Sequence, residues 1–375
     1  MNVSVMQKQL AHGLSTVSRA VSPRSTLPVL ANVLIATDEG RLRLSATNLE
    51  MGITCWIGAK IQEDGATTVP ARTFTDLVNT LSDPRVDLEL GDGLTLKVEC
   101  GHSSTNVKCI DAQEFPPMPV ADLDEGIFIN VADFKEMIQQ VAFAASSDEA
   151  RPILTGVLIE AKGEEITLYA TDGFRLSVRS ARLSAPVATP VRVVVPARAL
   201  TELARVASDG DETLTMLVLE NRNQVVFRLK DIELVTQLIE GNYPDVTQII
   251  PRTYQTRTVI STSAFLEACK RAEIFAREGS LIANLNIVPG GEMQPGTVEI
   301  SGQSEEIGSS RNVVDASIEG PPIVIAFNVR FLRDVLEVIK TPNVALETSR
   351  GDAPGVLRPI GEEQFLHVIM PMRPV

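Results

Sequence analysis

The sequence repeats itself at about one third of its 375 residues, and this repeat limits the folds that are open to the chain. VPARTFTDL starts at Val69 and VPARALTEL at Val195, which is an offset of 126 residues. LPVLANVLI starts at Leu27 and RPILTGVLI at Arg151, an offset of 124, and LSATNLE and LYATDGF are also 124 residues apart. Three matches in the same order and at nearly the same offset indicate copies of one domain.

A fainter third copy follows the first two. AFNVRFLRDVL places Arg330 where the VPAR segments place Arg72 and Arg198, LIANLNIVP matches LANVLI, and EISGQ stands at the position of ATN and ATD. The proline-bearing segments EFPPMP and EGNYPDV end the first two copies and lead to linkers near 120–127 and 246–257. The sequence therefore predicts three domains, at 1–122, 123–252 and 253–375.

Each copy shows the same order of predicted elements: a helix, two strands, a second helix that opens at or after a proline, and further strands. Apolar residues at helical spacing, such as Leu10, Leu14 and Val17, indicate the helices, and alternating residues at 41–44 and 87–90 indicate strands. This mixture predicts an α+β fold. The helices are predicted over residues 7–21, 71–81, 132–145, 197–208, 263–277 and 328–340.

The sequence lacks the motifs that are typical of several functional classes. There is no Walker-type loop, no GxGxxG after a strand, no HExxH and no GxSxG, and the histidines and cysteines show no zinc-ligand spacing. We therefore expect no metal and no cofactor, and we expect four free thiols in a reducing cytoplasm. No signal peptide is visible and no apolar run approaches about 18 residues, so a cytoplasmic protein without a membrane span is predicted.

One segment breaks the repeat. TDGFRL in the second copy replaces TNLE in the first, and it brings Asp172 close to Arg175. Such a pair is compatible with catalysis in an enzyme of DNA or nucleotide metabolism. A turn residue beside a surface ion pair explains the same residues without any chemistry.

Charge is distributed unevenly between the predicted elements. The chain carries −14, yet the six predicted helices hold twelve basic and eight acidic residues, a net +4, which leaves −18 for the rest. Solvated helix faces would explain this excess, and so would helices that face a polyanion. The overall acidity and the 4% aromatic content argue against a uniformly basic nucleic-acid binder and against a stacking platform. Three repeats in an arc favour the polyanion, because they can place all six helices on one side.

The repeat and its motifs resemble the bacterial beta sliding clamp family over essentially the whole chain. The resemblance rests on LPVLANVLI, the VPAR helices, RPILTGVLIE followed by YATDGFRLSV, EGNYPD, and the terminal VIMPMRPV. It implies a DNA-clamp fold in which three domains, each with two helices on antiparallel sheets, form a head-to-tail homodimeric ring. It also implies a non-catalytic protein that encircles duplex DNA without sequence preference and tethers the replicative DNA polymerase for processive synthesis.

The resemblance further implies a cleft between the second and third domains. This cleft would take short peptides from polymerases, the clamp loader, and repair and translesion polymerases, with Met and Leu forming an adaptable apolar floor. Gln248 replaces an arginine that is frequent in the family, and the chain ends in Arg-Pro-Val. The implied cleft residues are Leu154, Thr171, Gly173, Phe174, Arg175, Leu176, Pro244, Gln248, Ile249, Val368, Met370, Pro371, Met372 and Arg373.

DNA and dimer contacts also follow from the resemblance. An edge strand at 105–109, with Thr105 and Val107, is expected to lie against an edge of the third domain, and Ile274 and Phe275 are expected to pack beside it. Two arginines stand in loops at the face of the ring, and the other expected DNA contacts stand on helices. The implied DNA-binding residues are Arg24, Arg72, Arg151, Arg198, Arg205, Lys270 and Arg330.

Overall fold

The computed structural model describes residues 1–22, 25–91, 93–119, 126–208, 210, 212–291 and 294–373. Arg24 and the predicted domain boundary at 122/123 lie outside these residues, so both stay predictions. Within the described part of the chain, no helix has the length and apolarity needed to cross a bilayer.

In the described residues, each copy has eight strands and two α-helices in the order strand, helix, four strands, helix, three strands. The first copy contains β1 (Asn2–Met6), α1 (Gln7–Val17), β2 (Asn32–Asp38), β3 (Arg41–Thr47), β4 (Met51–Glu63), β5 (Ala66–Pro70), α2 (Ala71–Thr80), β6 (Arg85–Gly91), β7 (Thr95–Cys100) and β8 (Ser103–Lys108). The second contains β9 (Ile127–Asn130), α3 (Val131–Val141), β10 (Gly156–Lys162), β11 (Glu165–Thr171), β12 (Arg175–Arg182), β13 (Val191–Pro196), α4 (Ala197–Val206), β14 (Thr213–Leu219), β15 (Gln224–Arg228) and β16 (Ile232–Gln237). The third contains β17 (Thr256–Ser261), α5 (Thr262–Ala276), β18 (Ile282–Val288), β19 (Gly296–Ser304), β20 (Gly308–Glu319), β21 (Ile323–Asn328), α6 (Val329–Val338), β22 (Asn343–Thr348), β23 (Gly355–Pro359) and β24 (Phe365–Ile369).

The six predicted helices are confirmed, but the predicted strand order is wrong. A strand precedes the first helix of each copy, and four strands rather than two separate the helices. β1 and β5 are five residues long and run directly into α1 and α2 with no glycine or aspartate turn between them. The sequence pattern therefore merges these strands with the helices that follow.

The helices begin where the sequence allows a change of backbone direction. Pro70 precedes α2 with φ −58°, and the Asn328 side chain accepts a hydrogen bond from Arg330 N at the start of α6. On α2 the buried face consists of Ala71, Phe74 and Val78. Burial of a side chain as large as that of Phe74 contributes about 1.5–3 kcal/mol, which is more than the helix propensity of a single residue provides.

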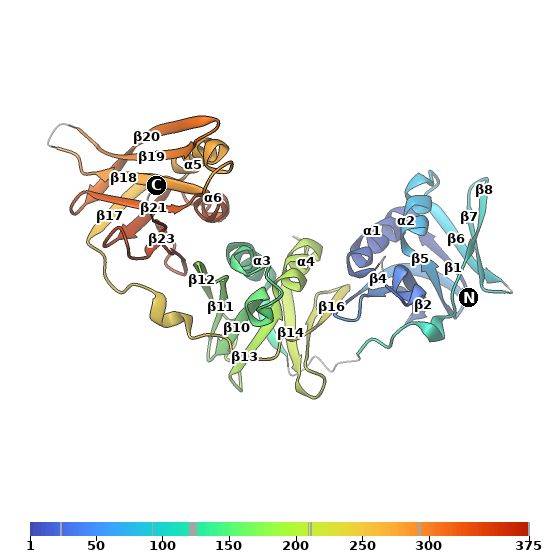
Figure 1. The fold of residues 1–375 in the computed structure, drawn as a ribbon. Coiled ribbons are helices and arrows are strands. Elements are labelled where there is room, and N and C mark those ends of the chain that lie inside the picture. The colour runs from blue at the N-terminus through green and yellow to red at the C-terminus, as the bar shows by residue number, and fades with distance from the viewer. Residues whose placement is uncertain are drawn as a thin grey trace. The chain divides into compact units, whose positions relative to one another are not determined.

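Contacts divide the chain into two compact units. The first comprises Met1–Ala132 with Glu202–Leu238, and the second comprises Asp133–Thr201 with Ile239–Val375. The sheet of the first unit runs β8-β7-β6-β1-β4-β16-β15-β14-β9, with β3, β2 and β5 attached beside β4. The sheet of the second runs β13-β10-β11-β12-β24-β23-β22-β17-β20-β19-β18-β21. Helices α1 and α2 lie side by side in the first unit, and α5 and α6 do so in the second (Figure 1).

Helix α1 approaches its sheet closely. Leu10, Leu14 and Val17 are fully buried. Gly13 lies on the same face, and a Cβ atom there would come within 2.7 Å of Leu44 Cδ1. The missing side chain therefore sets the distance between helix and sheet in the first copy.

The copies are joined by strand pairing. In the first unit β4 of the first copy pairs antiparallel with β16 of the second, with Gly52 opposite Val235. In the second unit β12 of the second copy pairs with β24 of the third, with Leu176 opposite Val368. We call these pairings the first and second junctions. At both, the fourth strand of one copy meets the last strand of the next.

Candidate functional site

The loop between β11 and β12 is held by its own side chains. Thr171 Oγ1 donates to Arg175 O at 2.6 Å and accepts from Gly173 N at 3.0 Å. Asp172 Oδ1 accepts from the backbone N–H groups of Phe174 and Arg175. Gly173 has φ +94°, a left-handed conformation that favours glycine. The turn leaves the Phe174 side chain 61% exposed.

Arg175 joins the second copy to the third. Its Nε donates to Asp172 Oδ2 at 3.0 Å, one terminal nitrogen donates to Asp334 Oδ2 at 2.8 Å, and the other donates to Phe143 O at 2.9 Å. The guanidinium also lies over the rings of Phe143 and Phe331, at 5.4 and 4.4 Å from their centroids. Its side chain is only 10% exposed.

The alternative assignment of Asp172 and Arg175 as a catalytic pair has no support in this geometry. The Asp172 carboxylate already accepts from two backbone N–H groups and from Arg175. Arg175 also pairs with Asp334 on α6. The side chains of Asp172 and Arg175 therefore both stabilise the second junction. Among the described residues, no group of three or more His, Cys, Asp or Glu side chains is placed to hold a metal ion.

A buried histidine lies in the second junction, one residue from Val368. His367 Nδ1 is 2.6 Å from Ser177 Oγ, and its ring stacks on Phe143 at a centroid distance of 5.4 Å. Its Nε2 has no hydrogen-bond partner among the residues that the structure describes. Burial, together with the Arg175 guanidinium, holds the pKa of His367 well below its ordinary value of 6.5.

This histidine predicts a pH dependence of stability. The folded-state pKa lies below the unfolded-state value, so the contribution of neutral His367 is complete above about pH 6.5 and is lost as the pH falls below it. We expect the difference in unfolding free energy between wild type and His367→Leu to shrink by about 1.4 kcal/mol per pH unit below roughly pH 6. Urea titrations from pH 7.5 to 5 measure it, and an unchanged difference would contradict the assignment.

The predicted cleft residues divide into a buried floor and an exposed rim. Leu154, Thr171, Leu176 and Val368 are buried. Leu176 and Val368 share an apolar cluster on the sheet with Tyr243 and Val246, which the linker supplies. The exposed members are Gly173, Phe174, Pro244, Gln248, Ile249, Met370 and Arg373. Phe174, Ile249 and Met370 are 61%, 43% and 39% exposed, so they offer the apolar surface that a peptide can cover.

Backbone hydrogen bonds hold the C-terminal Met-Pro-Met segment at both of its ends. Met370 N donates to Phe174 O, and Met372 N donates to Ala326 O, both at 2.8 Å. The second bond joins the tail to the edge strand β21, which the sequence did not predict. Pro371 and Met372 are half-buried. Gln248 Nε2 donates to Asp245 Oδ2 at 2.8 Å, and hydrogen bonds from Thr247 and Gln248 lower the pKa of Asp245.

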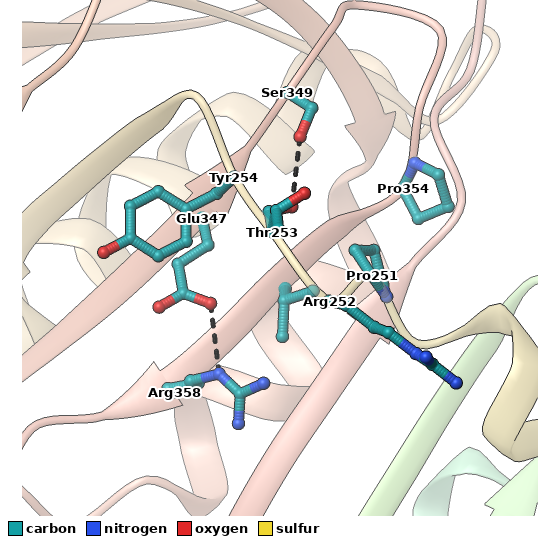
Figure 2. A pocket seen from close by; sticks show the side chains of 9 residues that line it. Pro251, Arg252, Thr253, Tyr254, Glu347, Ser349, Pro354 and Arg358 are labelled. Atoms are coloured by element: carbon teal, nitrogen blue, oxygen red, sulfur yellow. Dashed lines mark hydrogen bonds and ion pairs between the residues drawn. The ribbon is translucent and has the colours of Figure 1, made fainter.

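A hollow of about 210 Å³ lies beside this floor, where the linker meets β22 and β23 (Figure 2). Ser349 Oγ donates to Thr253 O, and Arg358 Nε donates to Glu347 Oε2 at 3.1 Å. Val356 belongs both to this lining and to the apolar cluster of Leu176. None of the predicted cleft residues lines the hollow.

Sequence reasoning missed the residues that hold the cleft together. Phe143, Phe331 and Asp334 fix Arg175, and Ser177 pairs with His367. Asp334 is 159 residues from Arg175, so no local pattern connects the two. The repeat gives a weak signal for it, because Asp334 occupies the position of Asp76 and Glu202 in the equivalent helices.

Six of the seven predicted DNA contacts are described, and all six are exposed. Arg72 and Arg198 have no ion-pair partner within the described part of the chain, whereas the other four are paired on the surface. Arg151 lies 3.4 Å from Asp148, Arg205 2.7 Å from Glu202, Lys270 2.9 Å from Glu337 and Arg330 3.4 Å from Glu273.

The charge excess of the helices is smaller than the predicted ranges indicated. Within the observed bounds the six α-helices hold nine basic and eight acidic residues, a net +1. Arg19, Arg277 and Lys340 account for the difference, because each lies just beyond a helix end. Lys340 also pairs with Glu136 at 2.9 Å. A cationic surface would therefore consist of individual exposed arginines and not of a charged helix layer.

The predicted dimer residues lie on two separate elements. β8 forms the end of its sheet. In this strand Thr105 is half-buried and Val107 is buried. On α5, Ile274 is 49% exposed and Phe275 is half-buried.

Comparisons with known proteins agree across the whole chain. The family models of the DNA polymerase III beta subunit match residues 1–119 with the N-terminal domain, 128–245 with the central domain and 247–373 with the C-terminal domain. The beta sliding clamp of Staphylococcus epidermidis is 31% identical over 382 aligned residues, covering 100% of this chain and 99% of the relative. That of Synechococcus elongatus is 32% identical over 378, with the same coverage.

The fold gives the same result. The crystal structure of the DNA polymerase sliding clamp from Bacillus subtilis matches all of this chain and all of its own, with a TM-score of 0.93 and 29% identity. The α+β arrangement of two helices per copy on antiparallel sheets is thus the three-domain clamp fold. The chain belongs to the bacterial beta sliding clamp family, the non-catalytic processivity subunits of DNA polymerase III.

Proposed function

We propose that two copies of the chain close head to tail into a ring around duplex DNA. The ring tethers the replicative polymerase and slides because its phosphate contacts are weak and independent of sequence. The observation that carries this proposal is the repetition of one junction geometry inside the chain. That repetition leaves one more pair of strand edges without a partner in the described structure.

The unpaired edges are complementary in position. Residues 308–315 of β20, the fourth strand of the third copy, pair only with β19, and β8 is the last strand of the first copy. Val313 on the open part of β20 is 57% exposed. Open edges of this length promote pairing with another chain. We infer that β8 of a second molecule pairs with this open edge, and two such heterologous contacts close a ring.

The repeat also predicts the register of this contact. Leu234 lies opposite Ile53 at the first junction, and His367 lies opposite Ser177 at the second. Thr105 occupies the place of Leu234, because each stands two residues after the turn that joins the last two strands. Ser310 occupies the place of Ile53, because Ile300 stands in β19 where Leu44 stands in β3, and Gly302 pairs with Ser310 as Ala46 pairs with Ile53. Thr105 of one protomer should therefore face Ser310 of the other.

A cysteine pair tests this register. Cα atoms directly opposite in antiparallel strands are about 4.5–5.5 Å apart, within the range of a disulfide. We expect the double variant Thr105→Cys, Ser310→Cys to form a covalently closed dimer on mild oxidation. Asn106→Cys with Ser310→Cys is the matched control, because successive side chains point to opposite faces. Equal crosslinking of both pairs, or of neither, would contradict the register.

The helices beside the junctions support the same closure. Arg19 pairs with Glu202 at 3.1 Å near the first junction, and Phe143 lies beside Arg175 at the second. Ile274 stands twelve residues after the start of its helix, as do Arg19 and Phe143. Asp76 of α2 occupies the position that Glu202 has in α4 and Asp334 has in α6, and its side chain is exposed. Ile274 and Phe275 are therefore placed to meet α2 of the second molecule.

The arginines that the repeat relates supply the test of the DNA surface. Replacing Arg72, Arg198 and Arg330 by glutamate reverses three exposed charges per chain. We expect weaker retention on DNA and a flatter dependence on salt, because fewer counterions are released on binding. Filter binding between 50 and 300 mM salt measures both, with Arg182→Glu, Arg192→Glu and Arg350→Glu as an equally charged control. Identical slopes for the two triple variants would show that the repeated arginines are only solvated helix residues.

The second junction is proposed as the docking cleft for short linear segments of the polymerase, the clamp loader, and repair and translesion polymerases. Phe174, Ile249 and Met370 would cover the apolar anchors of such a segment. Deleting residues 371–375 should abolish binding of a fluorescent clamp-binding peptide in anisotropy titrations. The melting temperature should fall only slightly, because the deletion removes one backbone bond worth about 1 kcal/mol. Unchanged peptide affinity would place the cleft elsewhere.

We also propose that the protein works in the cytoplasm, where the duplex DNA of a bacterium is replicated. The four cysteines are free, which suits a reducing compartment.

A further inference from the structure

The first junction carries a pocket at the position that the cleft occupies at the second. Its volume is about 200 Å³. The loop between β3 and β4 forms one wall, Val235 and Thr236 of β16 form the floor, and the segment 116–119 forms the opposite wall. All of these residues belong to the first compact unit.

The two loops are built by the same hydrogen bonds. Thr47 Oγ1 donates to Met51 O and accepts from Leu49 N, as Thr171 does in the second copy. Asn48 Oδ1 accepts from the N–H groups of Glu50 and Met51, as Asp172 Oδ1 does. Gln237 N donates to Glu50 O where Met370 N donates to Phe174 O. The backbone of the proposed cleft is thus present twice.

The side chains at equivalent positions differ in charge. Glu50 occupies the position of Phe174, and Leu27 occupies that of Arg151. Arg151 and Arg373 are exposed arginines beside the second cleft. Leu49 replaces Gly173 and is 52% exposed in the left-handed region, at φ +76°. The first pocket therefore combines an exposed apolar side chain with one exposed carboxylate, that of Glu50, whereas two exposed arginines and the exposed Asp245 lie at the second cleft.

Two acceptors at the first pocket have no partner among the described residues. The Glu50 carboxylate is exposed and makes no ion pair or side-chain hydrogen bond there. Gln224 Oε1, which also lines the pocket, is buried and accepts no hydrogen bond from any described residue. A buried acceptor without a donor is destabilising, and a ligand N–H group would satisfy it. Both groups select a ligand that donates hydrogen bonds or carries positive charge.

The apolar walls suit a single anchor side chain. At the position of Leu176 the first copy has Gly52, so no side chain fills this space. The flexible end of Met118 occupies part of it, since a Cβ atom at Gly52 would collide with Met118 Cε. Thioether side chains adapt to irregular partners, and the prolines at 116, 117 and 119 keep the opposite wall stiff.

We propose that the first junction is a second peptide-binding pocket, which takes a partner segment whose apolar anchor is flanked by lysine or arginine. It would bind independently of the second cleft and would discriminate by charge, since basic flanks are repelled at one cleft and attracted at the other. The inference rests on the proposed function only for the class of ligand, a short linear segment.

Two labelled peptides with the same Leu and Phe anchors test this proposal, one with two flanking lysines and one with two flanking glutamates. In anisotropy titrations, deletion of residues 371–375 should abolish binding of the glutamate peptide and leave that of the lysine peptide. Glu50→Lys should weaken the lysine peptide roughly fivefold, Glu50→Gln should weaken it less, and Glu50→Gln should leave binding of the glutamate peptide to the second cleft unchanged. Glu39→Lys, an equal change of charge at the exposed turn between β2 and β3, is the control.

Loss of both peptides on tail deletion, or an effect of Glu39→Lys equal to that of Glu50→Lys, would overturn the second pocket. Failure of the glutamate peptide to bind the wild type would instead overturn the proposed cleft at the second junction. Glu50 is exposed, so its variants should fold, and thermal melts that overlay with the wild type confirm that a loss of binding is local.

Discussion

Replacing Ile274 and Phe275 by aspartate is expected to convert the protein from a dimer into a monomer. The two side chains end α5 in the position that Arg19 and Phe143 occupy beside the junctions inside the chain. Burying two carboxylates without partners costs several kcal/mol of association free energy at one contact. A ring of two protomers has two such contacts, and both contain the substitutions. The molar mass measured by light scattering at about 1 μM should fall from twice 40.6 kDa to 40.6 kDa.

Val324→Asp is the matched control for this change. Val324 is 55% exposed on β21, an edge strand in the sheet of the second unit. This strand takes part in neither junction. It should leave the dimer intact, and circular dichroism should show native secondary structure in both variants. If the double aspartate variant still has the dimer mass, the interface does not involve this end of α5.

Replacing Arg175 by alanine is expected to destabilise the second junction strongly. The carboxylates of Asp172 and Asp334 would stay largely buried, with side chains 15% and 24% exposed, after losing the guanidinium between them. Breaking a buried pair from one side costs about 3–5 kcal/mol. For a unit of roughly 200 residues this corresponds to a fall of about 6–20 °C in melting temperature, measured by calorimetry.

Arg175→Lys separates charge from geometry. Lysine keeps the positive charge but cannot reach two carboxylates and Phe143 O together, so it should restore only part of the lost stability. Asp334→Asn should destabilise by less than Arg175→Ala, because it leaves Asp172 paired. A melting temperature unaffected by Arg175→Ala would show that the network does not hold the two copies together.

The sequence predicted the repeat and its helices because both are local patterns. Leu10, Leu14 and Val17 recur at helical spacing, and the structure buries all three. β1 and β5 were missed because each runs into a helix without a turn. The +4 of the predicted helices shrank to +1 because Arg19, Arg277 and Lys340 stand beyond the helix ends, where sequence boundaries are least precise.

The construction of the cleft could not be predicted from local patterns. Phe174 and Met370 were expected there from the resemblance, and the structure exposes both. The role of Arg175 depends on Asp334, which is 159 residues away, and the pairing of His367 depends on Ser177, 190 residues away. Nothing near either residue in sequence indicates its partner, since strand pairing between two copies brings them together. The internal repeat is the one signal that points to such contacts.

The central claim is that the protein holds DNA by topology and not by tight contact. The most direct measurement is retention on a nicked circular plasmid, loaded by a bacterial clamp loader with ATP and separated by gel filtration at 200 mM salt. The account predicts that the protein elutes with the circle and is released when a restriction enzyme linearises the same DNA. Equal retention on circular and linear DNA would contradict a ring and would show that binding depends on direct contact with the duplex.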